Sequence, residues 1–156
     1  MCLGVSTVSA QTDALVLEIE SIDLHETVVS MPTEIVEING KLFRRPVTPL
    51  NEVAWLFTSA MPDTGENIVM FGHDFTVFDR LDEVKYGDVA VLYANGVQYK
   101  YLITSISIMP DTNISNKERE RVGRMLGPQG KEVLTLVTCS GSDRLVVIGD
   151  RIYEVP

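Results

Sequence analysis

Two apolar segments joined by Asn95-Gly96 limit the fold of this chain more than any other feature of its sequence. Asn-Gly is the preferred centre of a two-residue hairpin turn, because both residues accept a positive φ. Residues 88–93 precede the pair and residues 97–108 follow it. In the second segment apolar and polar side chains alternate, which is the period of a strand with one buried face. The sequence therefore predicts an antiparallel hairpin in the middle of the chain.

Several further segments have the pattern of short strands, and only two have the pattern of a helix. The expected strands are residues 15–20, 35–38, 68–71, 133–139 and 144–155. The expected helices are residues 52–59, which Asn51 would cap, and residues 115–126, which begin with the capping-box pattern Ser-Asn-Lys-Glu. Many short strands with few helices are typical of a closed or nearly closed β-barrel.

Composition and charge exclude several classes of protein. The 156 residues have ordinary globular composition and suit one domain. A net charge of −9 disfavours nucleic acid as the main partner, because phosphate binding requires a basic face. No segment approaches the roughly 18 apolar residues of a membrane-spanning helix. The two cysteines, Cys2 and Cys139, are too few for a disulfide framework.

The first residues differ from the rest of the chain. Residues 1–12 carry no charge, and Val8-Ser9-Ala10 has the small residues of a signal-peptidase site, without a basic region or a full apolar stretch before it. A frayed terminus and the remnant of an export or anchor segment are both open interpretations. We expect residues 1–14 to form a disordered stub or such a remnant, and residues 15–156 to form a single domain.

The last expected hairpin brings together the residue types of a thiol enzyme. If residues 140–143 form the turn, Cys139 and Arg144 face each other, with Cβ atoms about 4.5–5.5 Å apart. A guanidinium there favours the thiolate, or stabilises the oxyanion formed when a thiol attacks a carbonyl. A thiol nucleophile also needs a base or counter-charge, and the chain has two histidines, His25 and His73. His73 follows an apolar strand and a glycine, where its side chain can project from the barrel rim.

Each of these residues also has an ordinary structural interpretation. A cysteine in a buried strand is most often a small core residue. A histidine at a strand end is commonly hydrogen-bonded or solvated, and Arg144 alone would be a surface charge paired with Asp143. The cysteine, the histidines and the carboxylates show no local spacing of metal ligands, so we expect neither a metal nor a cofactor. The residue types alone leave a thiol enzyme and a purely structural role both open.

The motifs around these residues resemble those of sortases, the cysteine transpeptidases of bacterial surfaces. Residues 135–139, Thr-Leu-Val-Thr-Cys, match the family motif Thr-Leu-x-Thr-Cys, and an apolar strand follows Arg144 as in the family. Residues 69–73 resemble the segment that presents the catalytic histidine. Further matches are Phe75, Phe78, Leu81 and Gly87-Asp88. The resemblance covers about residues 19–155 and does not point to one class of sortase.

The resemblance implies a mainly β fold, a sortase-like closed barrel of about eight strands with two or three short helices. It implies that His73, Cys139 and Arg144 are catalytic, and that Thr138 contacts substrate or only fills its strand. The thiolate of Cys139 would attack the Thr-Gly carbonyl of a sorting signal related to Leu-Pro-x-Thr-Gly. His73 would protonate the leaving amine, and Arg144 would hold the substrate backbone or the oxyanion. The thioacyl group would then pass to an amine.

The implied partners are surface proteins with a C-terminal sorting signal and an amine acceptor on the cell wall or a pilin. The implied location is the extracytoplasmic face of a bacterial membrane, with an anchor segment that this chain lacks. Two alternatives stay open: a cysteine peptidase that uses water as acceptor, and a non-catalytic barrel that serves as a binding module. The presence of all three catalytic residue types favours an enzyme. In the family, the region that corresponds to residues 110–131 lines the substrate groove. In this chain that region carries a charged helix, which does not align residue by residue with the family.

Overall fold

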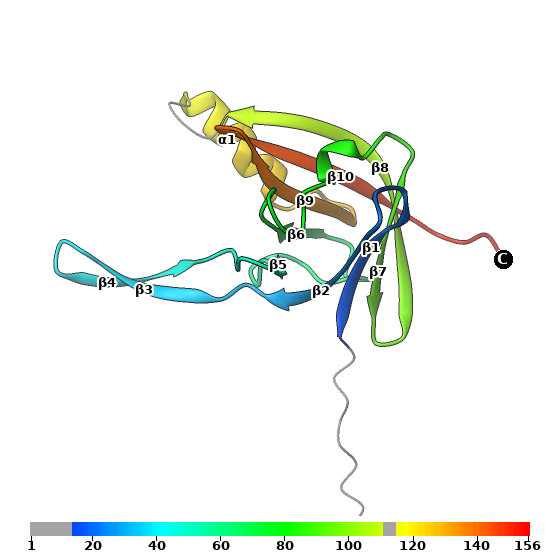
Figure 1. Cartoon of the computed structure of the whole chain (residues 1–156), viewed down its shortest axis with the longest axis horizontal. Coiled ribbons are helices and arrows are strands. Elements are labelled where there is room, and N and C mark those ends of the chain that lie inside the picture. Colours follow the sequence, from blue (N-terminus) through cyan, green and yellow to red (C-terminus); the bar gives the residue numbers. More distant parts are fainter. Residues whose placement is uncertain (1–13, 111–114) are drawn as a thin grey trace, which may run out of the picture.

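The computed structural model describes residues 14–110 and 115–156, and its main body is a closed barrel (Figure 1). The strand order around the barrel is β1-β2-β5-β6-β9-β10-β8-β7. These strands are β1 (Leu15–Ile19), β2 (Leu24–Ser30), β5 (Val53–Trp55), β6 (Asn67–Phe71), β7 (Val89–Ala94), β8 (Val97–Pro110), β9 (Val133–Ser140) and β10 (Asp143–Ile152). The expected closed barrel of about eight strands is confirmed. The expected stub at residues 1–14 lies, except for Ala14, outside the described residues.

The hairpin expected around Asn95-Gly96 is confirmed. β7 and β8 pair antiparallel, and the last pair before the turn is Ala94 with Val97. Asn95 has a φ of 52° and Gly96 a φ of 74°, as a type I′ turn requires. The long strand β8 pairs with β10 along its other edge. The hairpin thus supplies two neighbouring strands of the barrel wall.

A second hairpin, β3 (Thr33–Ile38) and β4 (Lys41–Pro46), forms a two-stranded sheet of its own. It extends away from the barrel (Figure 1). The sequence pattern predicts a strand here only at residues 35–38, although Asn39-Gly40 carries the same turn signal as the first hairpin. Both residues of this pair have a positive φ. The missed strand, β4, has no alternation of buried and exposed side chains, because all six of its residues are exposed.

The helix expected at residues 52–59 is wrong, because this segment contains strand β5. Val53 and Ala54 are completely buried. The strand pairs parallel with β2 and antiparallel with β6. A short apolar segment has the same pattern in a buried strand as in a buried helix, so the pairing with two neighbouring strands decides its conformation.

The helices that remain are short. α1 (Asn116–Leu126) is the α-helix of the described residues, and η1 (Glu20–Ile22) and η2 (Leu81–Glu83) are single 3-10 turns. The capping box at the start of α1 is confirmed: Glu118 N donates to Ser115 Oγ at 3.3 Å, and Ser115 N donates to Glu118 Oε2 at 2.9 Å. In the part of the chain that the structure describes, no helix is long and apolar enough to cross a membrane.

Candidate active site

Cys139 and Arg144 face each other where β9 and β10 approach their turn. The register pairs the two residues directly, and Arg144 Nη1 donates a hydrogen bond to Cys139 Sγ at 3.4 Å. Both side chains are half-buried. The expected pairing of Cys139 with Arg144 is confirmed. The turn is tighter than expected, because Ser140 still pairs with Asp143 and only Gly141-Ser142 connect the strands. A cationic donor at the sulfur stabilises negative charge there.

His73 follows β6, the strand that lies next to the strand of the thiol in the barrel. β6 and β9 run parallel, and their register ends at Phe71 with Val137. The pairing continues beyond that point, because Gly72 N donates to the Val137 carbonyl at 3.2 Å. The two strands therefore stay paired up to Gly72, one residue before His73, and Val137, two residues before Cys139. The structure brings the three expected catalytic residues to one end of the β6-β9-β10 sheet.

The chain around His73 holds the imidazole in place. His73 Nε2 lies 3.2 Å from the Thr48 carbonyl oxygen. Since a carbonyl can only accept, Nε2 carries the hydrogen in this arrangement. The ring also contacts the ring of Phe75, with centroids 5.0 Å apart. Gly72 is needed because a Cβ there would lie 2.7 Å from the Phe78 ring.

Thr138 and His25 have other surroundings. Thr138, expected as a substrate contact or a strand-filling residue, is buried, and its hydroxyl donates to the Gly72 carbonyl at 2.7 Å. This bond joins the strands that carry His73 and Cys139. His25 is exposed on β2, where its Nδ1 lies 3.0 Å from Glu18 Oε2. Of the two histidines, His73 is therefore the one that follows a strand paired with β9.

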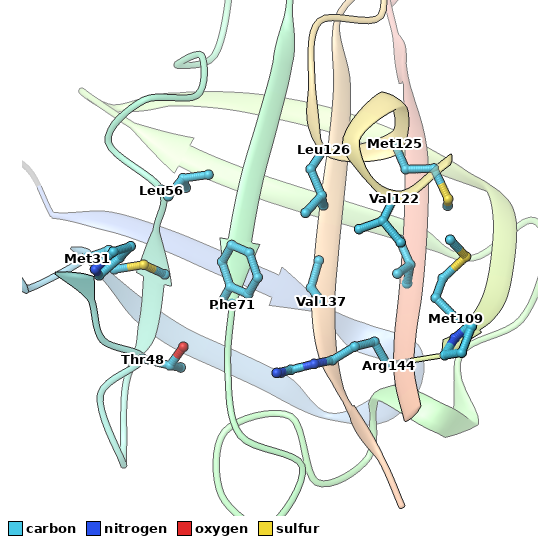
Figure 2. A pocket seen from close by; sticks show the side chains of 13 residues that line it. Met31, Thr48, Leu56, Phe71, Met109, Val122, Met125, Leu126, Val137 and Arg144 are labelled. Atoms are coloured by element: carbon cyan, nitrogen blue, oxygen red, sulfur yellow. The ribbon is translucent and has the colours of Figure 1, made fainter. Parts of the chain in front are cut away.

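An apolar cavity of about 330 Å³ opens beside Arg144. Phe71, Val137 and Val146 on the barrel strands form its floor. In Figure 2, Met31 and Leu56 stand on one side and the residues of α1 on the other, and the Arg144 side chain lies across one end. The α1 residues that line the cavity are Val122, Met125 and Leu126. The cavity can therefore accept apolar side chains next to the guanidinium.

A smaller hollow of about 210 Å³ reaches Cys139 at the barrel rim. It is lined by Ser140, Gly141, Leu145 and the aspartates Asp74, Asp79 and Asp82, among others. Among residues 14–110 and 115–156, no group of three or more histidine, cysteine or acidic residues is placed to hold a metal ion.

A buried polar cluster lies at the far end of the same hairpin. Tyr101 donates to Glu132 Oε1 at 2.7 Å, and burial raises the pKa of this phenol, with the Glu132 hydrogen bond acting in the same direction. Arg151 Nε lies 3.5 Å from the same oxygen, within ion-pair distance but without hydrogen-bond geometry. Its guanidinium lies over the rings of Tyr99 and Tyr153, at 4.9 Å and 4.8 Å from their centroids.

Sequence reasoning missed two groups of residues that matter for the site. The α1 residues that line the cavity were expected only as part of a charged helix with no assigned contact. Asn67, which joins α1 to the barrel, was not singled out either. Its position at the start of an apolar strand was the signal, because a polar side chain there must find partners if it is buried.

A closed barrel with a cysteine, a histidine and an arginine at one rim has the residue types of a thiol acyltransferase. The family model for the sortase domain matches residues 17–152, so the chain belongs to the sortase family. At the level of the family, membership indicates a cysteine transpeptidase that acts outside the cytoplasm at the bacterial surface. The resemblance found in the motifs is confirmed.

Solved structures of sortases share the fold. Sortase A from Corynebacterium diphtheriae, a lid mutant, is 24% identical with a TM-score of 0.66, and the match covers 92% of this chain and 72% of that chain. Sortase C1 from Streptococcus suis is 23% identical with a TM-score of 0.69, covering 91% and 74%. A sortase D5 transpeptidase from Clostridium perfringens is 20% identical with a TM-score of 0.67, covering 90% and 79%. Among curated proteins, none matches this chain in sequence.

Proposed function

We propose that this protein is a cysteine transpeptidase that cleaves a sorting signal related to Leu-Pro-x-Thr-Gly and transfers it to an amine. The observation that carries the proposal is the hydrogen bond from Arg144 Nη1 to Cys139 Sγ at 3.4 Å, beside an apolar cavity. A thiol with a cationic donor is suited to attack a carbonyl, because the donor stabilises both the thiolate and the oxyanion. The apolar cavity is suited to the leucine and proline of such a signal.

Cys139 provides the nucleophile. Its thiolate forms a bond to the carbonyl carbon of the signal's threonine, and the carbonyl electron pair moves to the oxygen. Arg144 donates to this oxygen or to the adjacent substrate backbone. When the electron pair returns, the bond to the glycine nitrogen breaks, and a thioester on Cys139 remains.

His73 provides the proton for the leaving amine. It protonates the glycine nitrogen as the carbon–nitrogen bond breaks, which leaves the imidazole neutral. An acceptor amine then attacks the thioester and gives a proton to His73. The Cys139 thiolate leaves, so both groups return to their starting protonation states.

The proposed partners are surface proteins with a C-terminal sorting signal and an amine on the cell wall or on a pilin subunit. The proposed place of action is the extracytoplasmic face of a bacterial membrane. Family membership supports both proposals. Thr138 has a structural role in this scheme, because its hydroxyl is bonded to the Gly72 carbonyl.

Mass spectrometry of the protein with sorting-signal peptides tests the proposal. The protein is incubated with a peptide library, with and without glycine oligomers or lysine peptides as acceptors. We expect an acyl adduct that maps to Cys139 and not to Cys2, and that disappears when an amine is added. An adduct that persists in Cys139→Ala, or no adduct with any peptide, would contradict the proposal.

The two histidines provide a matched pair of variants for the same assay. His73→Ala should lower turnover about 10²-fold, because it removes the general acid, whereas His25→Ala should leave turnover within twofold. An equal loss in both variants would show that the wrong histidine was assigned.

Water is the second candidate acceptor, because Cys139 is only half-buried. A cysteine peptidase on this fold would release the free threonine carboxylate at the same rate with and without amine. A transpeptidase should release the amide product when amine is present, and hydrolyse the peptide more slowly when it is absent.

A further inference from the structure

The helix that lines one side of the apolar cavity has little apolar packing. None of the α1 residues is fully buried, and only Val122, Met125 and Leu126 pack in part against the barrel. A second cavity, of about 460 Å³, adjoins the end of the helix and shares Leu56 and Leu126 with the first. Burial of apolar surface therefore contributes little to the position of this helix.

One buried side chain of the barrel binds the C-terminal end of α1. Asn67, the first residue of β6, is 3% exposed. Its Nδ2 donates to the Met125 carbonyl at 3.0 Å and to the Gly127 carbonyl at 2.9 Å. Carbonyls at the end of a helix have no partner within the helix, so they need donors from outside it. Asn67 is the donor from the barrel, and the Gly127 carbonyl also accepts from Gln129 Nε2 at 3.1 Å.

The amide of Asn67 is held in one orientation by Thr135 on β9. Thr135 is completely buried, and its hydroxyl donates to Asn67 Oδ1 at 2.7 Å. The oxygen is thereby occupied, and both hydrogens of the nitrogen are directed at the helix. β6 and β9 are the strands that lead to His73 and Cys139, so the same two strands carry the site and fix the helix.

We propose that Asn67 is a positioning residue for substrate specificity, which sets the width of the apolar cavity by holding the end of α1 against the barrel. Met125 and Leu126 line the cavity from the last turn of the helix, next to the carbonyls that Asn67 binds. In Figure 2 the Leu126 side chain points toward the floor residues Phe71 and Val137, and the Met125 side chain points toward Met109. The ligand is an extended peptide with an apolar side chain in this cavity. The identity of that peptide rests on the proposed function, whereas the position of the helix does not.

Asn67→Asp is the sharpest test at pH 8. The carboxylate has the shape of the amide and accepts from Thr135, but it cannot donate and it repels two carbonyl oxygens. We expect amide hydrogen exchange in residues 116–126 to become at least tenfold faster. The KM for a sorting-signal peptide should rise about tenfold, and the preference for leucine over alanine in the apolar position should fall by a similar factor. The kcat and the rate of Cys139 alkylation by iodoacetamide should stay within twofold.

Three further variants control this result. Thr135→Val removes the hydroxyl that orients Asn67 and should shift exchange and KM in the same direction by a smaller factor. Thr135→Ser keeps the hydroxyl and should behave as the unmodified protein. Asn116→Asp makes the same chemical change on an exposed residue of α1 and should alter neither measurement. If Asn67→Asp does not fold, the comparison of Thr135→Val with Thr135→Ser tests the role of Asn67.

Unchanged exchange in α1, or a fall in kcat with KM and selectivity unchanged, would overturn the role of Asn67. Turnover of no peptide by the unmodified protein would overturn the proposed function instead. In that case hydrogen exchange in α1 would still support or overturn the position of the helix assigned to Asn67.

Discussion

The two ends of β10 each carry an arginine, and the two arginines have opposite surroundings. Arg151 is buried against the carboxylate of Glu132, with side-chain exposures of 13% and 2%. Arg144 is half-buried, donates to a thiol and lies across the end of an open cavity. Glu132 just precedes β9 at one end of the hairpin and Cys139 lies near its other end, so one pair of strands places both sites.

The difference separates a charge that is packed against a buried carboxylate from a charge at the proposed active site. The Glu132 carboxylate accepts from Tyr101 and from Gly65 N, at 2.7 Å and 3.2 Å, in addition to its contact with Arg151. Loss of a partner would leave this buried carboxylate uncompensated. At the other end the cavity leaves space beside Arg144 for a substrate carbonyl. Mutation of Arg151 is therefore expected to lower stability, and mutation of Arg144 is expected to lower activity.

Arg151→Ala should have the largest effect on stability. It leaves the Glu132 charge buried without its cation, which costs about 3–5 kcal/mol. Urea unfolding measures this loss, and turnover per folded molecule should stay within twofold. Arg80→Ala is the matched control, because its ion pair with Glu83 at 2.9 Å is exposed and should contribute little to stability. Similar losses in the two variants would contradict the assigned role of Arg151.

Arg144→Ala should have the complementary effect, on activity. Removing a donor to the developing oxyanion costs about 10²- to 10³-fold in turnover. We expect the rate of acyl transfer from a sorting-signal peptide to fall by this factor and the urea midpoint to fall less than in Arg151→Ala. Arg144→Lys keeps the charge and should retain intermediate activity. A large loss of stability in Arg144→Ala, without a loss of turnover per folded molecule, would remove the distinction between the two ends.

Tyr101→Phe should change the pH dependence of stability by a smaller amount. The folded-state pKa of Tyr101 is raised above its unfolded value of about 10. The unfolded chain therefore loses this proton first as the pH rises, and the free energy of unfolding falls. Loss of this proton by the unfolded chain alone should lower the free energy of unfolding by about 1.4 kcal/mol between pH 9 and pH 11.

Urea unfolding at both pH values measures the fall, which should become smaller by this amount in Tyr101→Phe. Part of the fall should remain, because burial also raises the pKa of Tyr93. Tyr86→Phe, at an exposed tyrosine, is the control and should retain the whole fall. An undiminished fall in Tyr101→Phe would contradict the contribution of Tyr101.

Features set by neighbours in the sequence could be predicted, and features set by the packing of distant strands could not. The turn at Asn95-Gly96 and the capping box of α1 depend on a few consecutive residues. The facing of Cys139 and Arg144 depends on their spacing in one hairpin. In contrast, β5 is a strand only because β2 and β6 pair with it. The bonds from Asn67 to α1 join residues 58 and 60 positions apart, which no local pattern encodes.

The two-residue turn between β9 and β10 lies beyond the residues of the site, so the length of this loop can change without a change in the geometry of the site. Cys139 and Arg144 are held by ladder pairing on both of their strands, and Ser140 with Asp143 closes the ladder beyond them. Residues inserted between Gly141 and Ser142 would extend the chain outward without changing the register of the thiol and the guanidinium. The turn is therefore a point where new sequence can be added beside the proposed nucleophile while the strands that position it remain the same.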